Sequence, residues 1–156
     1  ATFTGTIISS FEDALKAVTV LTAFIPMIMG TGGNAGGQAS VTIIRGLSLN
    51  EIEFRDLFRV LWKEIRVAAL CGVTLAVANF FKLIYLDKIE FIVAIVICLT
   101  LVVVILIAKV VGSTLPMFAK KVGFDPAVMA SPFITTIVDA VALLVYFMIA
   151  TRLLGL

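Results

Sequence analysis

One acidic residue, Asp139, stands inside a long apolar stretch and is the first candidate for chemistry. The stretch covers residues 126–150, and Asp139 lies near its middle. An ionisable side chain within a membrane-spanning helix costs several kcal/mol, so it usually has a function. Ser131 and Thr135 precede it at helical spacing, which places all three side chains on one face. This pattern favours a site for a cation or a proton. The alternative is a carboxylate hydrogen-bonded to hydroxyl groups within a bundle.

The type of cation follows from the oxygens that this segment offers. Carboxylate, hydroxyl and carbonyl oxygens are hard ligands, suited to Mg²⁺, Ca²⁺ or Mn²⁺ rather than to soft metals. A single Asp139 cannot balance a divalent ion. Two copies related by a two-fold axis would supply two negative charges, and closed two-fold dimers are the commonest assemblies. We therefore expect a homodimer with its axis through an ion path.

A glycine-rich stretch at residues 30–38, with the sequence GTGGNAGGQ, is the second candidate. It lacks the GK[ST] of a nucleotide-binding loop and a βαβ context. Its glycines repeat at four-residue spacing, which is typical of close helix packing in membranes. Asn34 and Gln38 also recur at helical spacing, and amides within a membrane segment should face a partner or a pore. The packing role and the pore role are compatible.

Composition places the chain in the membrane and excludes several function classes. Of its 156 residues, 62% are hydrophobic, the mean hydropathy is +1.20, and the net charge is only +2. These values indicate an all-α integral membrane protein and argue against a nucleic-acid partner. The absence of histidine excludes His metal sites and triad hydrolases. Cys71 and Cys98 are interpreted as core thiols. The sequence shows neither an acid/base pair nor an activated nucleophile, so an enzyme is not expected.

The apolar segments predict a single transmembrane domain, residues 1–156, with five helices. The expected segments are residues 1–11, 17–44, 67–85, 91–118 and 126–150. The first is too short to span a bilayer, so we expect a truncated helix and a chain that is part of a longer protein. Pro26 predicts a discontinuous second helix. Asp125 as N-cap and Pro126 at the first helical position should begin the fifth.

Residues 45–66 have the pattern of an amphipathic helix. Apolar residues recur at helical spacing, charged residues fill the opposite face, and Ser48 with Glu51 resembles a capping box. We expect this helix to lie along the membrane surface with Trp62 at headgroup level. A solvated helix in a loop is the alternative.

Basic residues predict the orientation. Eight of them fall on the side of residues 45–66 and Lys120, against four on the other side, so the first side should be cytoplasmic and the C-terminus outside. The protein would lie in a prokaryotic inner membrane.

Taken together, these residues resemble the transmembrane domain of the MgtE-type magnesium transporters and channels. The resemblance is carried by Pro26 with the segment Gly32–Ser40, and by Asp125-Pro126-Ala127 with Ser131-Pro132-Phe133-Ile134-Thr135-Thr136, Asp139 and Tyr146-Phe147. It implies a homodimer of five-helix protomers with a channel-like pore between the second and fifth helices of both subunits. Cytoplasmic regulatory domains that close the pore are typical of the family, and nothing in residues 1–156 corresponds to them.

The resemblance also implies roles for individual residues. Asp139 would bind hydrated Mg²⁺, and the oxygens of Thr135 and Ser131 would help to hold its water shell. Asn34 would join this site, while Gly33, Gln38 and Thr136 would line the pore. Mn²⁺, Co²⁺ or Ca²⁺ could replace Mg²⁺ at such oxygens. Two other functions stay open: a proton- or sodium-coupled divalent cation carrier, and a membrane assembly domain without transport.

Overall fold

A computed structural model of the chain describes residues 4, 5, 7, 8, 19–129 and 131–155. This part of the chain is helical and contains no strand. The four long helices are α3 (Val20–Ser48), α4 (Leu57–Phe81), α5 (Phe91–Lys121) and α6 (Ser131–Leu154). Three helical spans are long and apolar enough to cross a membrane, namely Phe54–Leu86, Phe91–Lys121 and Pro132–Leu154. The helical content and these spans confirm the prediction of an all-α membrane protein. The five-helix count is not tested, because residues 1–11 lie largely outside the described part.

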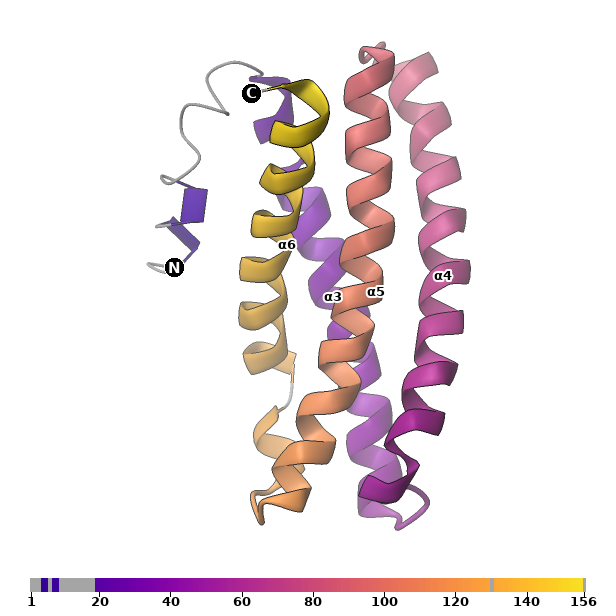
Figure 1. The fold of residues 1–156 in the computed structure, drawn as a ribbon, viewed down its shortest axis with the longest axis vertical. Coiled ribbons are helices and arrows are strands. Elements are labelled where there is room, and N and C mark those ends of the chain that lie inside the picture. The colour runs from indigo at the N-terminus through magenta and orange to yellow at the C-terminus, as the bar shows by residue number, and fades with distance from the viewer. Residues whose placement is uncertain (1–3, 6, 9–18, 130, 156) are drawn as a thin grey trace.

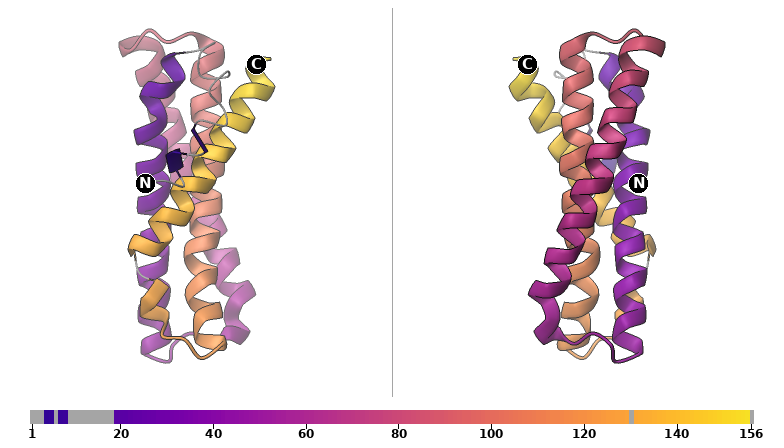
Figure 2. Two further views of the ribbon diagram at one scale, coloured as in Figure 1. Left: turned by 90° about the vertical axis from the view of Figure 1, so that its left-hand side faces the viewer. Right: turned by 90° about the vertical axis from the view of Figure 1, so that its right-hand side faces the viewer.

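Helix α5 lies at the centre of the bundle. Figure 1 shows α4 on one side of α5 and α3 with α6 on the other, and Figure 2 shows α6 crossing α3 obliquely. The middle of α5 is the most apolar part of the chain, and it buries Ile97, Leu101 and Ile105 completely. Ile97 and Leu101 contribute to a core that also includes Tyr146 and Phe147 of α6. An apolar helix that is buried on several sides is expected at the centre of a membrane bundle.

The prediction of a broken second helix is wrong, because α3 is continuous from Val20 to Ser48 with Pro26 inside it. A proline removes only one backbone N–H, and membrane helices tolerate this when neighbouring helices support them. The glycines of α3 allow that support. The carbonyl of Gly36 lies against Gly112 of α5 so closely that a Cβ on Gly112 would overlap it. On Gly32, a Cβ would lie 2.7 Å from Val104 and 3.0 Å from Val138.

The separate surface helix predicted for residues 45–66 is also not observed. Its first residues finish α3, where Ser48 donates a hydrogen bond to Ile44, and the chain then turns through residues 49–53. The next residues form a 3₁₀ turn, η1 (Phe54–Asp56), and continue directly into α4. The capping box is formed by Glu53 and Asp56 rather than by Ser48 and Glu51. An amphipathic pattern also arises where a membrane helix continues beyond the bilayer. Periodicity alone therefore does not distinguish a separate surface helix from the extension of a membrane helix.

The end of α4 and the remaining connections agree more closely with the sequence. Helix α4 closes in a π-helical turn, η2 (Lys82–Leu86), and α5 begins at Phe91 as predicted. The fifth segment starts with a 3₁₀ turn, η3 (Pro126–Met129), and α6 follows from Ser131. Asp125 caps η3 rather than α6, because its carboxylate accepts the backbone N–H of Ala127 at 2.9 Å.

Candidate cation site

The side chain of Asp139 lies against Gly33. A Cβ on Gly33 would lie 3.4 Å from Oδ1 of Asp139 and 3.3 Å from Cγ2 of Thr135. Asp139 is half-buried, and within the described residues its carboxylate forms no hydrogen bond or ion pair. The two stretches singled out in the sequence therefore meet, and the glycine provides the space. A carboxylate in a membrane-spanning helix is stabilised where water, an ion or a polar group reaches it.

The hydroxyl groups beside Asp139 are turned toward the start of their own helix. Thr135 and Thr136 both donate to the carbonyl oxygen of Pro132, at 3.0 and 2.9 Å. Neither hydroxyl therefore donates to Asp139, so the alternative of a carboxylate hydrogen-bonded to hydroxyl groups is not observed for these two threonines. The predicted ligand Ser131 is the first residue of α6, but its side chain lies outside the described part of the structure.

A shallow hollow of about 570 Å³ runs along the surface of α3 next to this contact. Its lining includes Gly33, Asn34, Gly37 and Gln38, and it continues to Val41 and Thr42. Asn34 and Gln38 are exposed, and their side-chain amides form no hydrogen bond with described residues. The hollow therefore presents amide groups and bare backbone, beginning at the glycine that contacts Asp139.

Two hydrogen bonds connect α3 to the last segment of the chain, one to α6 and one to η3. Tyr146, which is fully buried, donates to the backbone carbonyl of Leu21 at 3.0 Å. At the other end, the buried Ser40 donates to the carbonyl of Met129 at 2.7 Å. Each bond joins residues far apart in sequence, so neither role has a local signal. Asp139 lies between Met129 and Tyr146 in the sequence, so the chain is tied to α3 both before and after it.

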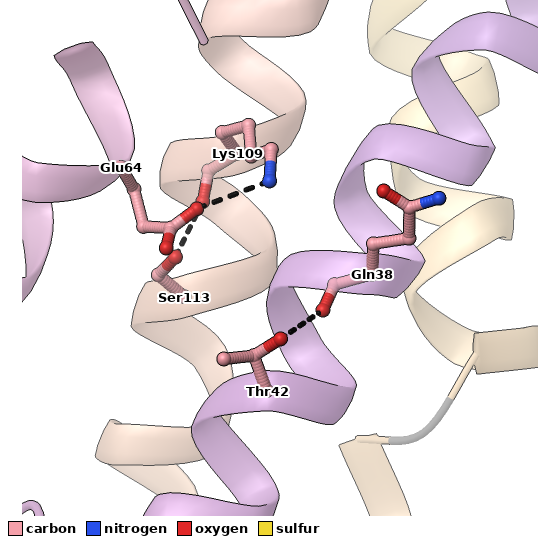
Figure 3. A network of polar contacts seen from close by, with 5 residues as sticks. All are labelled: Gln38, Thr42, Glu64, Lys109 and Ser113. Carbon is pink, nitrogen blue, oxygen red and sulfur yellow. Dashed lines mark hydrogen bonds and ion pairs between the residues drawn. The ribbon is translucent and has the colours of Figure 1, made fainter. Parts of the chain in front are cut away.

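One further charged pair lies between α4 and α5 (Figure 3). Nζ of Lys109 is 3.2 Å from Oε2 of Glu64, and the two side chains are only 12% and 8% exposed. Ser113 donates to the backbone carbonyl of Lys109 in the same region. The Oε2 atom is buried and has no hydrogen bond of good geometry, so the ion pair is its only partner among the described residues.

The described residues contain no cluster of three carboxylate, thiol or imidazole groups that could enclose a metal ion. Asp139 therefore contributes a single carboxylate next to Gly33. A single carboxylate cannot replace most of the water shell of Mg²⁺, an ion that gives up its water reluctantly. The chemistry of these groups therefore suits a hydrated cation better than a dehydrated one.

Comparison with known proteins gives a consistent picture. A family model described as "MgtE: Divalent cation transporter" matches residues 25–149. A protein of Thermus thermophilus named "Magnesium transporter MgtE" is 37% identical over 151 residues, which is 97% of this chain and 33% of that protein. Proteins with the same name from Bacillus subtilis and Enterococcus faecalis are 39% and 33% identical, over 94% and 95% of this chain. The chain thus spans about a third of the length of these relatives.

Proposed function

Because this chain belongs to the MgtE family of divalent cation transporters, we propose that it forms a pathway for Mg²⁺ across the membrane. The observation that carries the proposal is the carboxylate of Asp139, which lies half-buried against Gly33 without a partner among the described residues. A membrane protein retains such a charge where water or an ion can reach it. The relatives named as magnesium transporters favour Mg²⁺ over other hard cations.

We propose that the pathway forms between two copies of the chain. The hollow on α3 is open on one side, and its amides have no partner among described residues. A second copy placed across a two-fold axis would face the same groups and bring the total charge to −2. In this arrangement Asp139 binds the hydrated ion, with Asn34 and the backbone oxygens of Thr135 and Ser131 contacting its water shell. Gly33, Gln38 and Thr136 line the path.

The proposed path needs no proton, because the hydrated ion is held through water. Flux is then channel-like and follows the Mg²⁺ gradient. The orientation follows from the basic residues, most of which lie at the end of the bundle where α3 ends and α4 begins, so we assign that end to the cytoplasm. The C-terminus of α6 lies at the opposite end, and we assign it to the outside.

The test is Mg²⁺ uptake into proteoliposomes by the native chain and by Asp139→Asn. We expect uptake without an imposed proton gradient, reduced at least about tenfold in Asp139→Asn, which corresponds to about 1.4 kcal/mol or more. Asp125→Asn is the matched control, because this carboxylate caps η3 outside the membrane-spanning part of α6. It should leave uptake near the native level.

Other outcomes would favour the other functions. Uptake that occurs only with a proton or sodium gradient would make the protein a coupled carrier. Uptake that is unchanged in Asp139→Asn would contradict the proposed site. No uptake, together with no stabilisation of the native chain by Mg²⁺, would favour a membrane assembly domain.

A further inference from the structure

A second cavity lies at the basic end of the bundle, away from the cation site. It has a volume of about 480 Å³ and lies between the end of α3, the turn through residues 49–53 and the first turns of α4. Apolar side chains, among them Ile43, Ile52 and Val60, form part of its lining, and charged side chains form most of the rest. The cation pathway proposed above makes no use of it.

Three cations in this lining share one face of α4. Arg59, Lys63 and Arg66 are spaced four and three residues apart, which aligns them along the helix. All three are exposed, and none forms an ion pair with a described residue. Arg55, one turn earlier, differs because it pairs with Glu53 at 3.0 Å.

The carboxylates in the lining of this cavity already have partners within the protein, or they lie farther from the bilayer than the three cations. Glu64 is paired with Lys109 (Figure 3). Asp56 accepts the backbone N–H of Glu53 at 3.0 Å, and it precedes Arg66 by about 15 Å of helix. Glu51 is in the turn before η1. The positive charges are therefore the ones closest to the apolar part of α4.

The length of α4 sets the depth of these cations. The helical span Phe54–Leu86 has 33 residues, or about 50 Å, whereas the hydrocarbon core is about 30 Å thick. Residues 67–86 alone rise about 30 Å and carry one charge, Lys82, near their far end. Arg66 then lies at the hydrocarbon boundary, and Lys63 lies about 5 Å beyond it. Trp62, which is 63% exposed, lies at the depth where tryptophan is enriched in membrane proteins.

The same face of α4 continues into exposed apolar residues. Leu70, Val73 and Val77 follow Arg66 at intervals of four, three and four residues, and they are 72%, 54% and 50% exposed. We use the name α4 stripe for the six residues Arg59, Lys63, Arg66, Leu70, Val73 and Val77. Cations at headgroup depth followed by apolar side chains at hydrocarbon depth match the two parts of a phospholipid.

We propose that the α4 stripe and its cavity bind an anionic phospholipid. Arg66 and Lys63 contact the lipid phosphate, with Arg66 able to form two parallel hydrogen bonds to it, and Arg59 contacts the remaining polar headgroup. The acyl chains lie along Leu70, Val73 and Val77. Each cation near the membrane surface contributes about a fivefold preference for an anionic lipid, so the site as a whole discriminates against zwitterionic lipids.

Trp62 is the only tryptophan of the chain and lines the cavity, so it can report occupancy. The experiment compares the quenching of Trp62 fluorescence by nitroxide-labelled phosphatidylglycerol and phosphatidylcholine, with the label near the glycerol end of the acyl chain. Vesicles have the same lipid mole fractions and ionic strength. We expect tighter binding of phosphatidylglycerol, an approximately fivefold loss of that preference in Arg66→Gln, and parity in the triple variant R59Q/K63Q/R66Q.

Lys88→Gln serves as the control, because this exposed cation lies in the connection between η2 and α5, at the other end of α4 from Arg59. It should keep the native preference. Equal quenching by the two lipids in the native chain would overturn the proposal, and so would a preference that survives in the triple variant. Inorganic phosphate, added at ionic strength matched with chloride, separates the two sources of phosphate. Loss of the preference under phosphate would assign the site to a soluble anion instead of a lipid, whereas retention supports the lipid.

Discussion

The exposed faces of α4 and α3 lie on different sides of α5 and have different chemistry. At the depth of the hydrocarbon core, α4 exposes Leu70, Val73 and Val77. The middle of α3 instead exposes Asn34 and Gln38, which line a hollow together with glycines. The first face is suited to lipid, and the second needs water, an ion or another polar surface. The contrast supports the proposal that the cation path lies on the α3 side of the bundle.

The buried contacts of α4 and α3 also differ in the kind of residue that they involve. Helix α4 buries a charged residue, Glu64, against Lys109 of α5, while α3 buries glycines against α5 and α6. On the lipid-facing side, polar groups are paired inside the protein. On the α3 side, the backbones approach closely and Asp139 and the amides are left without partners among the described residues.

The largest expected effect is on the lipid-facing side. Lys109→Met would leave the carboxylate of Glu64 buried and unpaired, so we expect a loss of about 3–5 kcal/mol in the free energy of unfolding. The double variant E64M/K109M removes both charges and should recover most of this loss. Equilibrium unfolding in mixed micelles measures both. If the single variant were as stable as the double variant, the pair would not be desolvated as its 3.2 Å contact and low exposure indicate.

A smaller effect is expected where the two sides join at α5. Gly112→Ala would place a methyl group on the carbonyl of Gly36, which is backbone and cannot rotate away, so α3 and α5 must separate. We expect a loss of about 2–3 kcal/mol in the free energy of unfolding. Gly72→Ala, between α4 and α5, is the matched comparison. Its methyl group would lie 3.3 Å from Cα of Val102, a tight contact that needs only a small shift.

Thermal or denaturant unfolding of both glycine variants distinguishes the two interfaces. We expect Gly72→Ala to cost less than about 1 kcal/mol. Equal losses at Gly72 and Gly112 would mean that the α3–α5 contact is no closer than the α4–α5 contact, which would weaken the contrast between the two sides.

The smallest effect on stability, but a specific one on transport, is expected at Gly33. Gly33→Ala places a methyl group 3.4 Å from Oδ1 of Asp139, which narrows the site with a cost of about 1 kcal/mol at most. Mg²⁺ uptake should fall severalfold. At Gly30 a Cβ would meet nothing within 4 Å, so Gly30→Ala should gain about 0.5–1 kcal/mol and leave uptake unchanged. Similar uptake by the two variants would contradict the role of Gly33 in the site.

The residues of the candidate cation site carry local signals in the sequence. Asp139 is conspicuous as a charge in an apolar run, and Gly33 with Asn34 stands in a dense glycine segment. The α5 helix was predicted almost to its ends, since a continuous apolar run is bounded by polar turns. The contact between Gly33 and Asp139 was implied only by the family resemblance. Helical periodicity shows which residues share a face of one helix, but not which other helix packs against that face.

Other features depend on contacts between distant segments. The pairing of Glu64 with Lys109 could not be predicted, because the sequence pattern does not show which residues of two different helices face each other. The bonds of Tyr146 and Ser40 to backbone carbonyls have the same character. The two errors have a local cause. Pro26 and the charged residues 45–66 are both compatible with a break, and both are equally compatible with a helix that continues because its neighbours support it.

The contact of Gly33 with Asp139 also bears on the order in which the protein is built. Its two partners are separated in the chain by the whole of α4 and α5. Helix α3, with its many glycines, is not among the spans apolar enough to cross a membrane by composition. During synthesis it must therefore wait for α5 and then α6 before its glycine face is covered, and the contact of Gly33 with Asp139 is absent until the last helix has entered. A chain that stopped after α5 would have the apolar face of α4 without the carboxylate on which the proposed cation site depends.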